Sequence, residues 1–268
     1  MTARTNAEPA SHMSTARPGA CWLKSRLLTA GLVALGTCGI GAASSAPPTQ
    51  AQGTQPVPAD LLWARRLVAK VAPRDNVYAT DPTIVRWAGI AGAQRAVNRS
   101  VCSTFVDRVV EQAYGYPAPR VIAWLGVYAK TIHRAIAQRR GFVLVTTVGA
   151  IQPGDIMAIE YYDDDRPSTG HVMIVDQVPQ LLRAVAPRVS GTRQYAVAVI
   201  DSAMSGHGPA DTRAEADGRW QTGVGHGVFR LYADLQGHIA GYSWSATAGS
   251  AFYPPQIRDL VVGRLAPQ

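Results

Sequence analysis

The chain has 268 residues, of which 47% are hydrophobic and 16% are charged, and its formal net charge is +8. This composition excludes a disordered protein and a polytopic membrane protein, and the length is sufficient for one well-buried core. Residues 1–46 carry +3 of the charge, and the remainder contains neither a long basic run nor a nucleic-acid motif, so we expect no nucleic-acid partner.

The first 46 residues have the order of a secretory signal peptide. Lys24 and Arg26 precede an apolar run from Leu27 to Ala43, and small residues follow. The run has 17 residues, fewer than the roughly 20 that a membrane-spanning helix needs. We therefore expect residues 1–46 to be removed and the protein to be periplasmic or extracellular, without a membrane span and not as a lipoprotein.

Removal of this leader changes the cysteine count. Cys21 and Cys38 lie within it, so the exported protein would keep Cys102 alone. Cysteines of exported proteins usually pair, because their compartment is oxidising. An unpaired Cys102 is therefore either an inert buried thiol or a thiol retained for its chemistry.

The next part of the chain predicts a linker and then helices. The Pro- and Gln-rich stretch at 47–58 has no apolar periodicity and predicts the linker. Residues 74–100 are expected to be irregular. Apolar stripes at helical spacing predict helices at about 60–72, 102–115 and 119–138.

The second half of the chain predicts strands. Runs rich in β-branched and aromatic residues, separated by turn residues, lie at 142–148, 154–162, 171–178, 194–203, 227–233 and 238–245. The stretch 177–194 would be an inserted hairpin or loop. Helices followed by strands indicate an α+β fold, with an antiparallel sheet covered on one face by helices.

Cys102 and His171 are the strongest pair of candidate catalytic residues. Cys102 lies where a helix begins, and the positive end of the helix dipole stabilises a thiolate. His171 opens an apolar strand, so its imidazole can stand at the end of a sheet while the following residues anchor it. A thiolate and an imidazolium together can attack acyl carbons without a metal.

The third residue of such a site should accept a hydrogen bond from the second imidazole nitrogen. Asp201 ends the strand that follows and is our choice for this acceptor. Asp176 is the competitor, but it lies five residues after His171, so alternation along a strand directs it to the opposite face.

These residues lie in three short motifs. Cys102-Ser-Thr-Phe-Val106 begins a helix, Pro153-Gly-Asp155 precedes a strand, and His171-Val-Met-Ile174 forms the next one. Together they resemble the NlpC family of papain-like cysteine peptidases, over roughly residues 98–205. The resemblance implies a papain-like fold, with helices packed on an antiparallel, partly barrel-like sheet, and cleavage of cell-wall peptides. It places a catalytic core at 98–205 and a C-terminal β extension at 206–268, within a single domain spanning 59–268.

The sequence departs from the family pattern in four places. Val101 stands where the family usually has Asp, and Thr104 where it usually has Gly. Asp201 lies 30 residues after His171 instead of about a dozen. Tyr78 is the nearest tyrosine that precedes the nucleophile, where many relatives have an oxyanion donor, and it is distant in sequence.

Three further residues are predicted to line the cleft and bind substrate: His207 and His226, both in Gly-rich loops, and Trp244. Surface histidines without a function are the alternative for the first two. A zinc site from these histidines with His171 and Asp201 lacks any established ligand spacing, so we expect no metal and no other cofactor.

The sequence therefore predicts an exported, monomeric cysteine endopeptidase or amidase that acts on peptides or peptidoglycan through Cys102, His171 and Asp201. Two alternatives stay open. An acyl or amide transferase would use the same acyl-enzyme, and a non-catalytic wall-associated binding module would keep only the scaffold.

Overall fold

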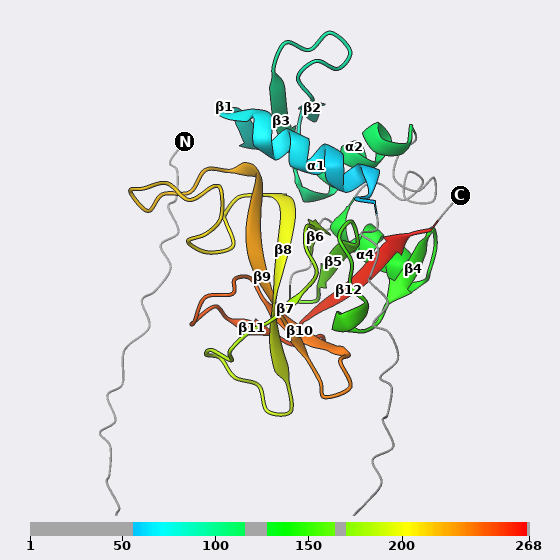
Figure 1. Ribbon diagram of the computed structural model, residues 1–268, viewed down its shortest axis with the longest axis vertical. Coiled ribbons are helices and arrows are strands. Elements are labelled where there is room, and N and C mark those ends of the chain that lie inside the picture. The colour runs from blue at the N-terminus through cyan, green and yellow to red at the C-terminus, as the bar shows by residue number, and fades with distance from the viewer. Residues whose placement is uncertain (1–55, 116–127, 164–169, 267–268) are drawn as a thin grey trace, which may run out of the picture. The chain divides into compact units, whose positions relative to one another are not determined.

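Three α-helices are present among the residues that the computed structural model describes, which are 56–115, 128–163 and 170–266 (Figure 1). They are α1 (Ala59–Lys70), α2 (Cys102–Tyr114) and α4 (Ala129–Ala137). The predicted signal peptide, most of the predicted linker and the first half of the predicted helix at 119–138 lie outside the described residues. All described residues belong to one structural unit.

Nine of the described strands form one large antiparallel sheet, in the order β11-β10-β9-β8-β6-β5-β12-β4, with β7 paired to β8. Its strands are β4 (Phe142–Val145), β5 (Ile156–Tyr161), β6 (Gly170–Val175), β7 (Gln180–Leu181), β8 (Arg193–Ala203), β9 (Gly223–Ala233), β10 (Ile239–Ser243), β11 (Phe252–Tyr253) and β12 (Arg258–Leu265). The predicted α+β class is therefore confirmed, and the stretch before β8 contains a short hairpin.

The sheet curls but remains open. A single bridge joins Thr147 to His238, which lie at the two ends of the strand order. Within the described residues no ladder of hydrogen bonds joins β11 or β10 to β4 or β12, so the sheet does not close into a barrel.

The C-terminal strand lies inside the sheet. β12, red in Figure 1, pairs with β5 on one side and with β4 on the other. A side chain at Gly263 would collide with Ile136 of α4, because its Cβ would lie 2.7 Å from that side chain. Glycine at this position lets α4 pack closely, so the C-terminal segment belongs to the core of the fold and is more than an extension.

Alternation along the strands separates two apolar clusters. In β5, Ile156 and Ala158 contact the cluster that includes the helices, while Met157 and Ile159 face a second cluster on the other side of the sheet. Both faces are therefore buried along the central strands, and only the strand ends can present polar side chains to a cleft.

The segment at 74–100, predicted to be irregular, contains most of a small three-stranded sheet, so that prediction was wrong. The sheet has the order β1-β3-β2 and consists of β1 (Val71–Tyr78), β2 (Ile84–Arg86) and β3 (Ala96–Ser100). The Asn76 side chain donates to the Val224 carbonyl oxygen and accepts from the Val224 N–H, both at 2.8 Å. The Asn76 amide thus links β1 to β9 with two hydrogen bonds of the kind that paired strands make through their backbones. No pattern of apolar residues in the sequence predicts this contact.

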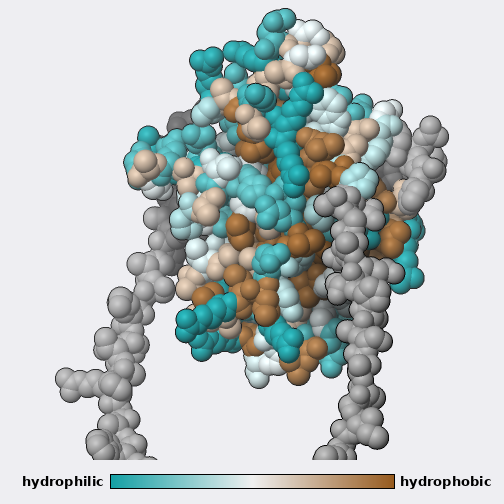
Figure 2. Space-filling model, in the orientation of Figure 1, coloured by the Kyte–Doolittle hydropathy of each residue, from teal (hydrophilic) through white to brown (hydrophobic). Residues whose placement is uncertain are grey.

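Hydrophilic and hydrophobic residues are interspersed on the face shown in Figure 2. Two of the exposed large apolar side chains, Met204 and Trp220, lie between β8 and β9. No helix in the described ranges is long and apolar enough to cross a bilayer.

Candidate active site

Cys102 is the first residue of α2, and its surroundings fix the geometry of that helix end. Val101 occupies the N-cap position, where its side chain offers no hydrogen-bond acceptor to the first turn. Thr104 compensates, because its Oγ1 accepts from the Val101 N–H at 3.1 Å and lies 3.2 Å from the Val101 carbonyl oxygen. The threonine that departs from the family pattern therefore closes the turn that carries the thiol.

His171 and Asp201 meet where β6 and β8 stop pairing. The ladder between these strands consists of Ile174 with Ile200 and Val175 with Val199. Beyond it, Nε2 of His171 lies 2.5 Å from Oδ2 of Asp201. Both residues are buried, so the hydrogen bond operates without competition from bulk water.

The imidazole of His171 also interacts with Cys102. Burial disfavours the protonated ring, but the charge of Cys102 and hydrogen bonds to Asp201 and Cys102 outweigh burial and raise the pKa of His171 to about 9. Asp201 occupies Nε2, so Nδ1 is the nitrogen of His171 that remains for the thiol. We call Cys102, His171 and Asp201 together the Cys–His–Asp relay.

Asp201 is held by two further buried groups. Its Oδ2 also lies 2.9 Å from Nε2 of His207, and its Oδ1 lies 2.9 Å from Nη2 of Arg213. Burial opposes ionisation of Asp201, yet Arg213, His207 and His171 hold the pKa of its carboxyl well below the usual range. Asp201 is thus a fixed anion that can orient and stabilise an imidazolium.

Asp211 completes this network. It accepts from Nε and Nη2 of Arg213 at 2.9 and 2.8 Å, and from the backbone N–H of His207 at 2.8 Å. Arg213 also donates to the Gly223 carbonyl oxygen. Each buried charge therefore faces a partner of opposite sign, as a stable buried network requires.

His171, Asp201 and His207 are close enough to be considered as metal ligands, since their donor atoms all lie within 4.8 Å of one another. However, two atoms that bind the same tetrahedral zinc ion at about 2.0 Å are separated by roughly 3.3 Å. Separations of 2.5 and 2.9 Å from one carboxylate oxygen fit N–H donors instead. The set is thus better suited to hydrogen bonding than to holding a metal.

His207 and Trp244 lie beside the relay. His207 was predicted to bind substrate, but its side chain has no exposed surface and supports Asp201. The Trp244 ring centroid lies 4.7 Å from that of His171 and 4.5 Å from that of His207. Trp244 is partly exposed and is thus the aromatic side chain beside His171 that reaches solvent.

Asp176 and His226 lie together on the other face of the sheet. Nε2 of His226 is 2.9 Å from Oδ2 of Asp176, and Arg65 of α1 donates to Oδ1 at 2.6 Å. Alternation along β6 correctly separated Asp176 from His171. His226, predicted as a substrate contact, instead joins the sheet to α1 together with Asp176 and Arg65.

Tyr78 is the residue at the site that sequence reasoning set aside. It ends β1 and pairs with Ser100 of β3, two residues before Cys102. Burial raises the pKa of Tyr78 to about 12, and the negative charges of Cys102 and Asp201 add to the rise. The phenol is thus neutral and within electrostatic reach of the relay. Tyr78 lies 24 residues before Cys102 in the sequence, and the pairing of β1 with β3 brings the two residues close together.

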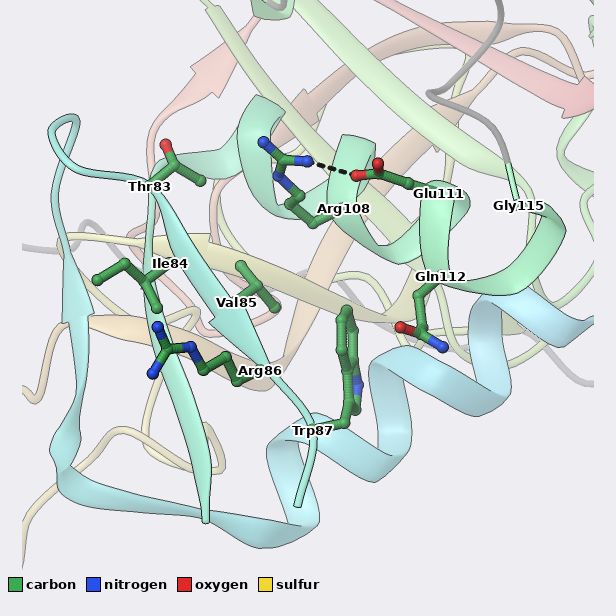
Figure 3. Close-up of a pocket in the computed structure, with 9 residues that line it drawn as sticks. All are labelled: Thr83, Ile84, Val85, Arg86, Trp87, Arg108, Glu111, Gln112 and Gly115. Atoms are coloured by element: carbon green, nitrogen blue, oxygen red, sulfur yellow. Dashed lines mark hydrogen bonds and ion pairs between the residues drawn. The ribbon is translucent and has the colours of Figure 1, made fainter. Parts of the chain in front are cut away.

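A separate pocket of about 540 Å³ lies between β2 and the later turns of α2 (Figure 3). Arg108 and Glu111 form an ion pair at its rim, and the Trp87 ring closes one side. The lining residues are Thr83, Ile84, Val85, Arg86, Trp87, Arg108, Glu111, Gln112 and Gly115. Cys102, His171 and Asp201 are not among them, so this pocket is distinct from the candidate active site.

No family model matches the chain, and no solved structure matches it. The chain is similar to an uncharacterized protein of Acanthamoeba polyphaga mimivirus, with 28% identity over 221 residues. The match covers 78% of this chain and 96% of the viral protein. The similarity therefore extends well beyond the segment that carries Cys102 and His171.

Proposed function

We propose that this protein is a cysteine hydrolase that cleaves amide bonds through Cys102, His171 and Asp201. The observation that carries the proposal is the buried imidazole of His171, which is hydrogen-bonded to Asp201 at 2.5 Å and lies near enough to Cys102 for the thiol to raise the pKa of the ring. An inert buried cysteine has no need of an imidazole that is itself held by a fixed anion. This arrangement favours an activated thiol.

The reaction would proceed in two steps. The Cys102 thiolate attacks the carbonyl carbon, and His171 donates its proton to the leaving amine as the C–N bond breaks, which gives a thioester. His171, now neutral, takes a proton from water, which attacks the thioester; the C–S bond breaks, the acid is released, and the Cys102 thiolate and the protonated His171 are regenerated. Asp201 stabilises the imidazolium in both steps and itself stays ionised.

Two kinds of donor are available for the developing oxyanion. Backbone N–H groups at the start of α2 point toward the N-terminal end of the helix, where Cys102 lies. The Tyr78 hydroxyl is a side-chain donor, and its raised pKa keeps it protonated at neutral pH. Donors placed before the reaction begins cost no reorganisation during it.

The resemblance to the NlpC family adds a substrate class and a location. It rests on the motifs around Cys102, Asp155 and His171, and it makes peptides of the bacterial cell wall the expected substrate on a papain-like scaffold. Together with the predicted signal peptide, it leads us to propose that the protein acts after export.

The test compares the protein with its Cys102→Ala variant on purified peptidoglycan and on model peptides, measuring new amino groups. We expect the variant to lose activity on the order of 10³-fold or more. Asp201→Asn should also lose most activity, whereas Asp176→Asn, a matched change on the other face, should keep it. Equal activity of wild type and Cys102→Ala would refute the mechanism.

Alkylation of Cys102 provides a readout that needs no substrate. An ordinary thiol, with a pKa of about 8.5, reacts slowly with iodoacetamide at about pH 6. We expect fast labelling of wild type at that pH and slow labelling of Asp201→Asn. Slow labelling of both proteins would instead favour a binding module without catalysis.

A further inference from the structure

A second cationic group lies on the same face of the sheet as His171. Arg258 pairs with Tyr161 across β12 and β5, while Ile159, two residues before Tyr161, pairs with His171. Side chains two residues apart on a strand share a face. With strands about 4.8 Å apart and about 3.3 Å per residue, the Cα atoms of His171 and Arg258 are roughly 12 Å apart.

The guanidinium of Arg258 is held between two aromatic rings. Its Cζ lies 4.2 Å from the ring centroids of both Tyr161 and Tyr253, and 24% of the Arg258 side chain stays exposed. Stacking on both sides fixes the plane of the guanidinium. A planar fork held in this way is suited to recognising a carboxylate.

A buried hydroxyl beside Arg258 lacks a hydrogen-bond acceptor. Tyr242 is fully buried, and its ring centroid lies 5.3 Å from that of Tyr253. Arg258 can only donate to its Oη, so the Tyr242 O–H finds no acceptor among the described residues. Burial raises the pKa of Tyr242, although Arg258 opposes the rise, so the hydroxyl keeps its proton. Leaving such a group unpaired costs about 1–3 kcal/mol, which an oxygen of a bound ligand would relieve.

Tyr161 connects this group to the candidate active site. Burial raises the pKa of Tyr161, and nearby Arg258 and Cys102 act on it with opposite signs. Its phenol therefore lies within electrostatic reach of both the guanidinium and the thiol. Tyr161 ends β5 and Arg258 begins β12, so a ligand that runs from Cys102 along these strand ends would pass Tyr161 before it reaches Arg258.

We propose that Arg258 and Tyr242 bind a carboxylate of the substrate, about three residues from the scissile bond. The inference rests on the proposed function and deepens it, because it makes acidic peptides the substrate class. The residue spacing follows from about 3.3 Å per residue of extended peptide. Asp163 now bonds Nε and Nη2 of Arg258 at 2.8–3.1 Å and would compete with the substrate carboxylate.

Protection of Cys102 from iodoacetamide tests this subsite without turnover. Three acetylated tripeptides serve as probes: Ala-Ala-Ala with a free carboxylate, Ala-Glu-Ala amide and Ala-Gln-Ala amide. The first two present a main-chain and a side-chain carboxylate, respectively, and the third is the neutral control. We expect at least one acidic probe to protect at a tenfold or more lower concentration than the neutral probe.

Variants assign the effect to Arg258. Arg258→Gln should remove the preference for the acidic probe, whereas Arg188→Gln should keep it, because Arg188 is exposed in the loop that precedes β8, at the end of that strand remote from Asp201. Asp163→Asn should strengthen protection by the acidic probe. If circular dichroism shows that Arg258→Gln does not fold, Arg258→Lys replaces it and should weaken the preference, because lysine lacks the planar fork.

Equal protection by acidic and neutral probes in the wild-type protein, including no protection by any of them, would overturn the subsite. So would an unchanged preference in folded Arg258→Gln or Arg258→Lys. These outcomes differ from failure of the proposed function, which would show as slow labelling of Cys102 at about pH 6 and no loss of activity in Cys102→Ala.

Discussion

His207 and Asp201 share a hydrogen bond of 2.9 Å between Nε2 and Oδ2, so one carboxylate oxygen serves two imidazoles. Nδ1 of His207 lies 2.8 Å from the carbonyl oxygen of Trp244. Both nitrogens of His207 therefore face hydrogen-bond acceptors. Asp201 consequently cannot turn away from His171 without breaking several buried contacts.

This network explains how a residue 30 positions after His171 comes to hold the imidazole of His171. β7 pairs with the first half of β8, and the second half of β8 pairs with β6 and ends at the relay. The contacts from His207 and Arg213 fix Asp201 within that strand end. Sequence spacing between the second and third site residues is therefore less informative than the strand pairing.

The pH dependence of activity should show a descending limb near pH 9. The pKa of His171 is raised from 6.5 to about 9, so the ring is protonated below that pH and loses its proton above it. Protonation of the leaving amine then fails. We expect kcat/KM to fall about tenfold per pH unit above pH 9, measured on a model peptide, while alkylation of Cys102 continues to be fast.

The same shift makes a prediction about stability. The stabilisation from this proton is fully present below about pH 6.5 and is lost as the pH rises through about 9. In Cys102→Ala the charge that most strongly raises the pKa of His171 is gone, so the stabilisation should be smaller and its loss should be complete at a lower pH. Urea unfolding from about pH 6 to 10 measures both proteins, and identical pH profiles would contradict this assignment.

Tyr78→Phe should lower kcat/KM by about 10²-fold if the phenol donates to the oxyanion. The ring itself would stay, so packing against β3 should be preserved and the melting temperature nearly unchanged. Alkylation of Cys102 should also stay fast, because no oxyanion forms in that reaction. A variant with full activity would remove Tyr78 from the mechanism and leave the backbone donors.

Arg213→Gln should destabilise the fold by roughly 3–5 kcal/mol, because it leaves Asp201 and Asp211 as buried charges without their cation. Arg219→Gln is the matched control in the same segment. Arg219 is 77% exposed and pairs with Glu215 and Asp217, so its loss should cost about 0.5 kcal/mol or less. Urea denaturation of both variants measures the difference, and equal costs would mean that the buried network is not stabilising.

Gly223→Ala should disturb the site through the small sheet. A Cβ at Gly223 would lie 2.2 Å from Oδ1 of Asn76, which is two residues before Tyr78. Gly218 has a similar positive φ, +81° against +98°, but open space around it, so Gly218→Ala should cost only about 1–2 kcal/mol of backbone strain. We expect Gly223→Ala to lose several-fold more stability, and kcat/KM to fall in that variant alone.

The strands of the large sheet were largely predictable, because their residues alternate or form continuous apolar runs between turns. β1, β2 and β3 were not. In β1, Pro73, Arg74 and Asp75 oppose strand formation, and the side chain of Asn76 supplies hydrogen bonds to β9. β12 was also missed, because its glycine and two arginines obscure the apolar pattern. Its place between β5 and β4 depends on pairing with residues more than 90 positions away.

The sequence by itself determined the candidates for the chemistry: Cys102 at a helix start, the histidine at a strand start and the choice of Asp201 over Asp176 all follow from local periodicity. Only the tertiary structure decided what surrounds them. Tyr78, Arg213 and Arg258 reach the site or its neighbourhood through strand pairing and buried ion pairs. Such contacts depend on long-range register and desolvation, which leave no periodic trace in the sequence.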